Sequence, residues 1–163
     1  MNPLRWLLDH SVWGRNGVPA EDWRYRGLYR WVLPLTDIFF FWFGVVGFWN
    51  GINTVEAAAS QTWQEYWSLG IAIASAIAFI GVLFPKLWLV ELIGKIPLVG
   101  LVSVYIAIFF MQGLTKTPNM LATAGLISIL ILLPIWRIGD MGFVTWKRKE
   151  TKEAHREYLT EGE

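Results

Sequence analysis

One acidic residue, Asp37, lies inside the first of four long apolar segments of the 163-residue chain. Because an ionised side chain is costly to bury in hydrocarbon, such a carboxylate is a candidate for binding a proton or a cation. A structural interpretation competes with this one. Pro34 starts a helix here, and the dipole and free N–H groups of a helix N-terminus stabilise a nearby carboxylate, with Arg30 also within reach. We prefer the structural interpretation and keep Asp37 as the candidate functional polar residue.

The other residue types that carry chemistry give no further site. The chain has no cysteine, which excludes disulfides, thiolate metal sites and a cysteine nucleophile. Its two histidines, His10 and His155, lie outside the apolar segments, so neither can hold a haem between the helices. The sequence contains no recognisable catalytic set, no HExxH and no glycine-rich phosphate loop. We therefore expect a non-enzymatic protein with no catalytic residues, metal or cofactor.

Small residues recur at helical spacing along the apolar segments. Such a stripe lets two helix backbones approach closely in a membrane, where lipid gives no hydrophobic drive for helix pairing. The paired helices can belong to one chain or to two. We prefer packing inside one bundle, because four helices use up most of their own small faces. The candidate helix-packing residues are Gly47, Gly51, Gly70, Ala74, Ala78, Gly100, Ser103 and Ala107.

The apolar segments themselves decide the fold class. The chain is 55% hydrophobic and 17% charged, whereas about 25% of the residues in a soluble domain are charged. Each segment approaches the roughly 20 residues that a helix needs to cross a hydrocarbon layer of about 30 Å. The sequence therefore predicts an all-α integral membrane protein with four transmembrane helices. The expected spans are Trp31–Trp49, Trp67–Phe84, Ile96–Met111 and Met120–Trp136.

Basic residues predict the orientation of these spans. Of the fourteen Lys and Arg residues, all except Lys116 lie in the N-terminal segment, in the turn after the second span with Lys86 and Lys95, or in the C-terminal tail. Because basic residues near helix ends stay in the cytoplasm, both termini are expected inside, in a bacterial inner membrane or a plasma membrane. The expected division is a cytoplasmic or interfacial segment 1–30, a four-helix transmembrane domain 31–136 and a charged cytoplasmic tail 137–163.

The segments outside the spans also carry patterns. Residues 3–13 and 19–30 predict amphipathic helices at the membrane interface. Asn53 and Glu56 have the spacing of a capping box, which predicts a helix from Thr54 that runs without interruption into the second span. Most of the eleven tryptophans fall near predicted span ends, where indole rings anchor a protein at headgroup depth. No cleaved signal peptide is expected, because no small-residue cleavage pattern follows the first apolar run.

Because the sequence shows no catalytic, metal-binding or cofactor-binding residues, its function is inferred from the membrane architecture. The leading hypothesis is a non-enzymatic membrane protein that acts through oligomerisation or through contact with other membrane proteins. One alternative is a holin-type pore-former, and another is a small ion-coupled transporter that uses Asp37. The expected partners are the lipid bilayer and a second copy or another membrane protein. Nucleic-acid binding is not expected, because the basic cluster of the tail is short and lies next to the membrane.

Overall fold

The computed structural model describes residues 11–14, 25–52, 55 and 59–160, with side chains described as far as Phe143. Residues 3–10 and 19–24 of the two expected N-terminal helices, and both residues of the capping box, lie outside the described residues. Of the remainder, 25–30 are helical and 11–13 form a turn. The described part of the chain is helical and contains no strand. Its elements are η2 (Leu28–Val32), α2 (Leu33–Asn50), α4 (Gln61–Leu83), η3 (Pro85–Leu87), α5 (Trp88–Thr115) and α6 (Asn119–Thr160).

Four helices are long and apolar enough to cross a membrane, as the sequence predicts. The second span begins six residues earlier than expected, at Gln61, and the third and fourth differ most in their bounds. The third begins at Trp88 rather than at Ile96, so that Glu91 and Lys95 lie within a helix instead of a turn. The fourth does not end at Trp136 but continues as one helix of 42 residues. The charged groups are tolerated inside these helices because they pair with one another, as described below.

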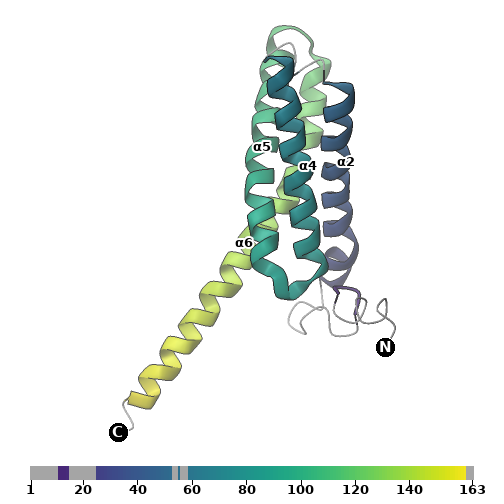
Figure 1. The fold of residues 1–163 in the computed structure, drawn as a ribbon. Helices are drawn as coiled ribbons and strands as arrows, with labels where there is room; N and C mark the ends of the chain where they lie inside the picture. Colours follow the sequence, from purple (N-terminus) through teal and green to yellow (C-terminus); the bar gives the residue numbers. More distant parts are fainter. Residues whose placement is uncertain (1–10, 15–24, 53–54, 56–58, 161–163) are drawn as a thin grey trace, which may run out of the picture.

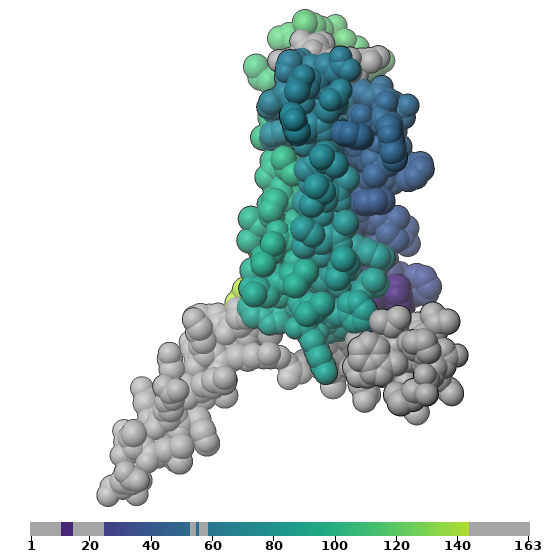
Figure 2. All heavy atoms as spheres, in the orientation of Figure 1, coloured from purple at the N-terminus to yellow at the C-terminus, as the bar shows by residue number. Residues whose placement is uncertain are grey.

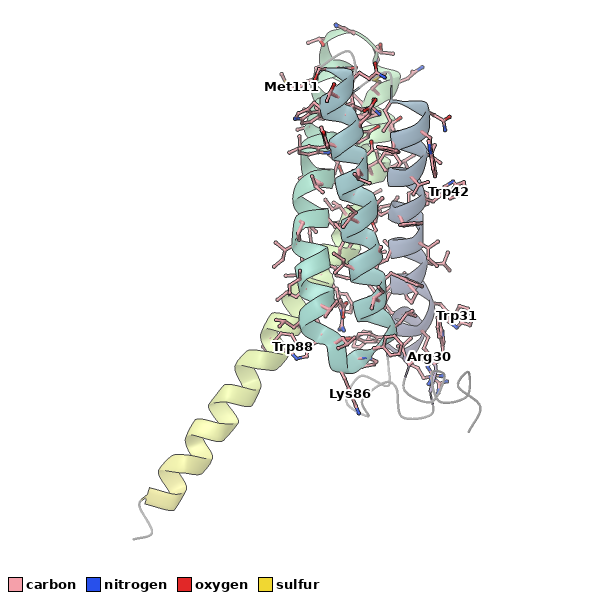
Figure 3. The ribbon with its side chains drawn as sticks, viewed as in Figure 1. Arg30, Trp31, Trp42, Lys86, Trp88 and Met111 are labelled. Carbon is pink, nitrogen blue, oxygen red and sulfur yellow. The ribbon has the colours of Figure 1, made fainter. Side chains whose placement is uncertain are left out.

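The four helices run alternately up and down (Figure 1). The segment that precedes α2, the turn from α4 to α5 and the exit of α6 therefore lie at one end of the bundle. We name this the basic end, because Arg30 and Lys86 both lie there (Figure 3). The loop after α2 and the turn after α5 form the opposite end, which we name the distal end. Beyond the basic end, the second half of α6 projects away from the bundle (Figure 1).

Helix α4 packs closely against both α2 and α5, because small residues line the contacts. A Cβ added at Gly94 of α5 would overlap the backbone of Ala78, and one added at Gly44 of α2 would lie 2.6 Å from the backbone nitrogen of Ala72. Ala74 is also buried in the contact with α5, whereas its neighbour Ile73 is 52% exposed. The side chains that remain on the outside are mostly large and apolar, as a lipid-facing surface requires. Figure 2 shows one long face of this surface, formed by α2, α4 and α5.

The second span does not begin where the capping-box pattern predicts. Helix α4 begins at Gln61, after Ser60, whose hydroxyl accepts a hydrogen bond from the backbone N–H of Trp63 at 3.3 Å. Ser60 itself is extended, so no uninterrupted helix runs from Thr54 into the span. A serine hydroxyl satisfies one of the free N–H groups of a helix start, and it does so here next to the apolar run.

Candidate functional site

A network of charged side chains, buried at its inner part and half-buried at its outer part, lies inside the bundle towards its basic end. Asp37 comes from α2, Glu91 and Lys95 from α5, and Arg137 and Asp140 from α6. Glu91 and Lys95 are one turn apart, so both project from the same face of α5. The network thus joins three of the four spans through charged groups.

Asp37 and Lys95 form the innermost pair. The Lys95 ammonium donates to both carboxylate oxygens of Asp37, at 3.1 and 3.4 Å. Their side chains are only 2% and 1% exposed. The structural interpretation preferred from the sequence, in which a helix start stabilises Asp37, does not fit this geometry. The chain is already helical from Leu28, two turns before Asp37. Arg30 is not its partner either, because that guanidinium donates to the carbonyls of Val12 and Gly14.

Glu91 lies at the centre of the network. Its carboxylate accepts two hydrogen bonds from the Arg137 guanidinium, at 2.8 and 3.1 Å. One of its oxygens also lies 3.4 Å from the Lys95 ammonium. Bidentate pairing of this kind fixes the relative orientation of two side chains as well as their distance. Glu91 consequently holds α6 against α5 and shares Lys95 with Asp37.

Tyr29 and Asp140 complete the network at the basic end. Arg137 donates to the Tyr29 hydroxyl at 2.9 Å and to Asp140 at 3.0 Å, and the same hydroxyl donates to Asp140 at 2.7 Å. The guanidinium also lies 4.5 Å from the centre of the Tyr29 ring. These contacts link η2 to α6, two elements more than a hundred residues apart in the chain.

The turn at residues 11–14 packs against the basic end beside this network. Val12 is 3% exposed and packs with Tyr29, Leu33 and Val82. Its backbone N–H donates to the carbonyl of Leu83, and its carbonyl accepts from Arg30. The N-terminal turn is therefore docked onto the bundle rather than lying apart from it.

An apolar layer separates the network from the distal end. Phe40 and Leu98 lie one turn beyond Asp37 and Lys95 respectively, and each is almost fully buried. The layer consists of Phe40, Ile71, Ala74, Leu98, Val102 and Ile131. Among the described residues, no charged side chain lies between this layer and the distal end of the bundle interior. The charged side chains therefore occupy only the half of the bundle next to the basic end, and they do not form a polar path through it to the distal end.

An apolar groove runs beside Asp37 on the outside of the α2 and α4 pair. Its volume is about 260 Å³. Three of its lining residues, Ile38, Phe41 and Ile80, are also exposed on the outer surface of the bundle. The full lining is Asp37, Ile38, Phe41, Ala76, Phe79 and Ile80. Asp37 belongs to this lining, but its side chain is almost fully buried and both of its carboxylate oxygens bond Lys95, so the groove wall itself is apolar.

The structure divides the predicted small residues into two groups. Ala74 and Ala78 lie in the contact of α4 with Gly94, and Gly70 faces Leu101 of α5. Gly47 lies against Ser68 of α4, and Gly51 ends α2 with a φ of 70° that favours glycine. The remaining three residues differ from expectation, because they do not pack inside the bundle. Gly100, Ser103 and Ala107 are exposed on α5.

Four charged members of the network, and Tyr29, were absent from the sequence-based candidates. Glu91 and Lys95 fall outside the expected third span, which hid their spacing of four residues on one helix face. Arg137 and Asp140 fall beyond the expected end of the fourth span. Glu91 and Lys95 could have been found by their spacing, because an acid and a base four residues apart lie side by side on one face of a helix.

Comparisons of the chain with protein-family models, with curated proteins and with solved structures find no match.

Proposed function

We propose that the chain is a non-enzymatic membrane anchor that presents a helix outside the membrane for contact with another protein. The observation that carries this proposal is the continuity of α6. Its 42 residues make a helix of about 63 Å, roughly twice the thickness of the hydrocarbon core. About half of the helix therefore extends beyond the membrane, and Figure 1 shows that half projecting from the basic end.

The ion pairs of Arg137 support a fixed orientation of the projecting half of α6 relative to the bundle. Arg137 lies in the last two turns of the fourth span, and it is bonded to Glu91 of α5 and to Tyr29 of η2. A guanidinium with a planar fork of donors holds a carboxylate more rigidly than an ammonium does. A helix clamped at this position transmits the orientation of the bundle to its outer half.

The same proposal places the basic end in the cytoplasm. Within the sequence of the projecting half, Lys147, Arg148 and Lys149 follow the membrane directly. Basic residues next to a span favour the cytoplasmic side and an anionic leaflet. Both termini then lie in the cytoplasm, and the partner is a cytoplasmic protein or the cytoplasmic part of a membrane protein.

Photocrosslinking in the native membrane tests this function. A photoreactive amino acid is placed at Ala154 on the projecting half of α6, and at Ile129 on the exposed face of the same helix inside the membrane. We expect position 154 to give a discrete adduct with one other polypeptide, which the control position does not give. Adducts with lipid alone at both positions, or the same protein adducts at both, would contradict the proposal.

A holin-type pore is a second candidate, and one observation favours it. The small residues Gly100, Ser103 and Ala107 are exposed on α5, where a second chain can approach closely. A pore has to form between chains, since the apolar layer closes the interior of one bundle. Abrupt dye uptake by cells above a threshold of expression supports the pore. Growth without dye uptake at every level of expression removes it.

A further inference from the structure

Two arginines near the basic end, Arg30 and Arg137, have different partners. Arg137 is neutralised by an acid, because its guanidinium donates two hydrogen bonds to the carboxylate of Glu91. Arg30 has only main-chain partners. Its Nε and Nη2 donate to the carbonyl oxygens of Val12 and Gly14, at 3.1 and 2.9 Å. These carbonyls orient the guanidinium but carry no net charge that balances it.

Part of the Arg30 guanidinium is open. An arginine has five N–H donors in a planar fork, and the two carbonyls accept only from Nε and Nη2. No carboxylate of the described residues forms an ion pair with Arg30. The side chain is half-buried, so it is held in place and still reachable from the surface. Nη1 and Nη2 present the parallel donors that a phosphate group accepts.

Exposed tryptophans place this guanidinium at the depth of lipid headgroups. Trp31 and Trp88 are 64% and 44% exposed and lie at the basic end (Figure 3). Indole rings are favoured at the membrane interface. Arg30 and Lys86 lie one and two residues before these tryptophans, on the side away from the middle of the bundle (Figure 3). The anion that a membrane supplies at this depth is the phosphate group of a phospholipid.

The turn at residues 11–14 preorganises the site. The Trp13 indole N–H donates to the main-chain carbonyl of Arg30 at 2.9 Å. Val12 accepts from the Arg30 side chain, and its own N–H donates to the carbonyl of Leu83 at the end of α4. Arg30 is thus held through both its main chain and its side chain. A side chain that is already ordered loses less conformational freedom when a ligand binds.

We propose that Arg30 binds the phosphate group of one anionic phospholipid, with Nη1 and Nη2 donating to two phosphate oxygens. A net negative headgroup supplies the counter-charge that Arg30 lacks, whereas a zwitterionic headgroup brings a cation of its own. The acyl chains lie along the exposed face of η2 and α2, where Trp31 and Leu35 are one turn apart and mostly exposed. This proposal depends on the membrane location of the bundle but not on the contact of α6 with a partner.

Equilibrium binding to the full chain tests the proposal. The chain is immobilised on beads through a C-terminal tag in a neutral maltoside detergent, and tritiated phosphatidylglycerol is measured against beads without protein. The competitors are unlabelled phosphatidylcholine with the same acyl chains and inorganic phosphate. We expect saturable binding that an equal concentration of either competitor does not displace. Displacement by phosphatidylcholine would show that the headgroup charge is not recognised, and displacement by inorganic phosphate would assign the site to a free anion. Either result overturns the proposal.

Four variants locate the site. Arg30→Gln is expected to weaken binding of phosphatidylglycerol by about tenfold or more, because it removes charge-assisted hydrogen bonds. Arg30→Lys keeps the charge without the fork of donors and is expected to weaken binding to a smaller extent. Lys86→Gln removes one charge at the same end and is expected to lose less than Arg30→Gln. Lys116→Gln removes one exposed charge at the distal end and is expected to bind as the unmodified chain does.

Each result decides the proposal. Loss of binding that is largest in Arg30→Gln and absent in Lys116→Gln supports the site. Equal losses in Arg30→Gln and Lys86→Gln would mean that the overall positive charge of the basic end attracts the lipid, and they overturn it. Unchanged binding in Arg30→Gln, or no saturable binding above beads without protein, also overturns it. If Arg30→Gln does not fold, Arg30→Lys decides, because binding equal to that of the unmodified chain excludes the bidentate contact.

Discussion

Lys95 Nζ of α5 lies 3.1 Å from Asp37 Oδ2 of α2, and both side chains are almost fully excluded from the surface. The pair joins two spans that are separated along the chain by the whole of α4. Inside a membrane, an ion pair of this kind cannot exchange its partner for water, so each group depends on the other. The first predictions test that dependence.

Asp37→Asn is expected to destabilise the bundle well beyond what the loss of a helix-dipole contact costs. Breaking a buried pair by removing one partner costs about 3–5 kcal/mol, whereas a favourable dipole contact contributes about 0.3–1 kcal/mol. Because Glu91 remains near Lys95 as a counter-ion, we expect a loss of unfolding free energy of about 3 kcal/mol. Unfolding in mixed detergent measures the difference. The control Glu65→Gln makes the same change of acid to amide at a surface carboxylate of α4. A loss no larger than that of Glu65→Gln would show that the pair does not stabilise the bundle.

The double variant Asp37→Leu with Lys95→Leu is expected to be more stable than either single variant. Replacing both charges removes a carboxylate and an ammonium together, and well-packed apolar residues are often as stable as the buried pair. Glu91 and Arg137 keep each other in this variant. A double-mutant cycle of unfolding free energies measures the coupling. Additive losses would mean that the two residues do not depend on each other.

Arg137→Leu is expected to loosen α6 from α5. It leaves Glu91 without its bidentate partner and removes the link to Tyr29. The chain has no cysteine, so spin labels can be attached at Leu89 of α5 and Phe143 of α6 alone. The distribution of distances between these labels should broaden in the variant. Lys86→Leu, at an exposed base in the turn, serves as the control and should leave the distribution narrow.

Ala74→Leu is expected to destabilise the bundle, whereas Ile73→Leu is not. Ala74 is 4% exposed in the contact between α4 and α5, and overpacking at such a site costs about 1–3 kcal/mol. Ile73 is 52% exposed on the outer surface, where a change of shape costs within about 0.5 kcal/mol. Detergent thermal stability and crosslinking of oligomers are measured together. Loss of oligomer without loss of stability would place Ala74 in a contact between chains instead.

The topology proposal predicts which loops are accessible from each side. Reporters inserted after Gln61 and after Thr117 are expected to register outside, and a reporter after Lys86 or at the C-terminus inside. Lys86 is chosen because it lies in the turn before α5, whereas the following residues lie in the helix. A cytoplasmic signal after Thr117 would reverse the orientation of the bundle.

The number and the character of the spans were readable from the sequence, because they depend on a local quantity. Twenty apolar residues in a row must form a helix in lipid whatever lies beside them. Helical periodicity also placed Ala74 and Ala78 on one stripe of small residues, and both lie in the contact of α4 with Gly94 of α5. Asp37 could also be singled out as the acid within a span.

The partners of Asp37 could not be read in this way. A charged residue lowers the mean hydropathy of a segment, so the predicted third span began only after Lys95 and the predicted fourth span ended before Arg137. In the folded bundle each of them has a counter-ion on another helix, and the unfavourable burial of one charge is offset by its neighbour. The exposed position of Gly100, Ser103 and Ala107 has the same origin. Which face of a helix meets another helix depends on the whole set of packed faces, and only the tertiary structure brings that set together.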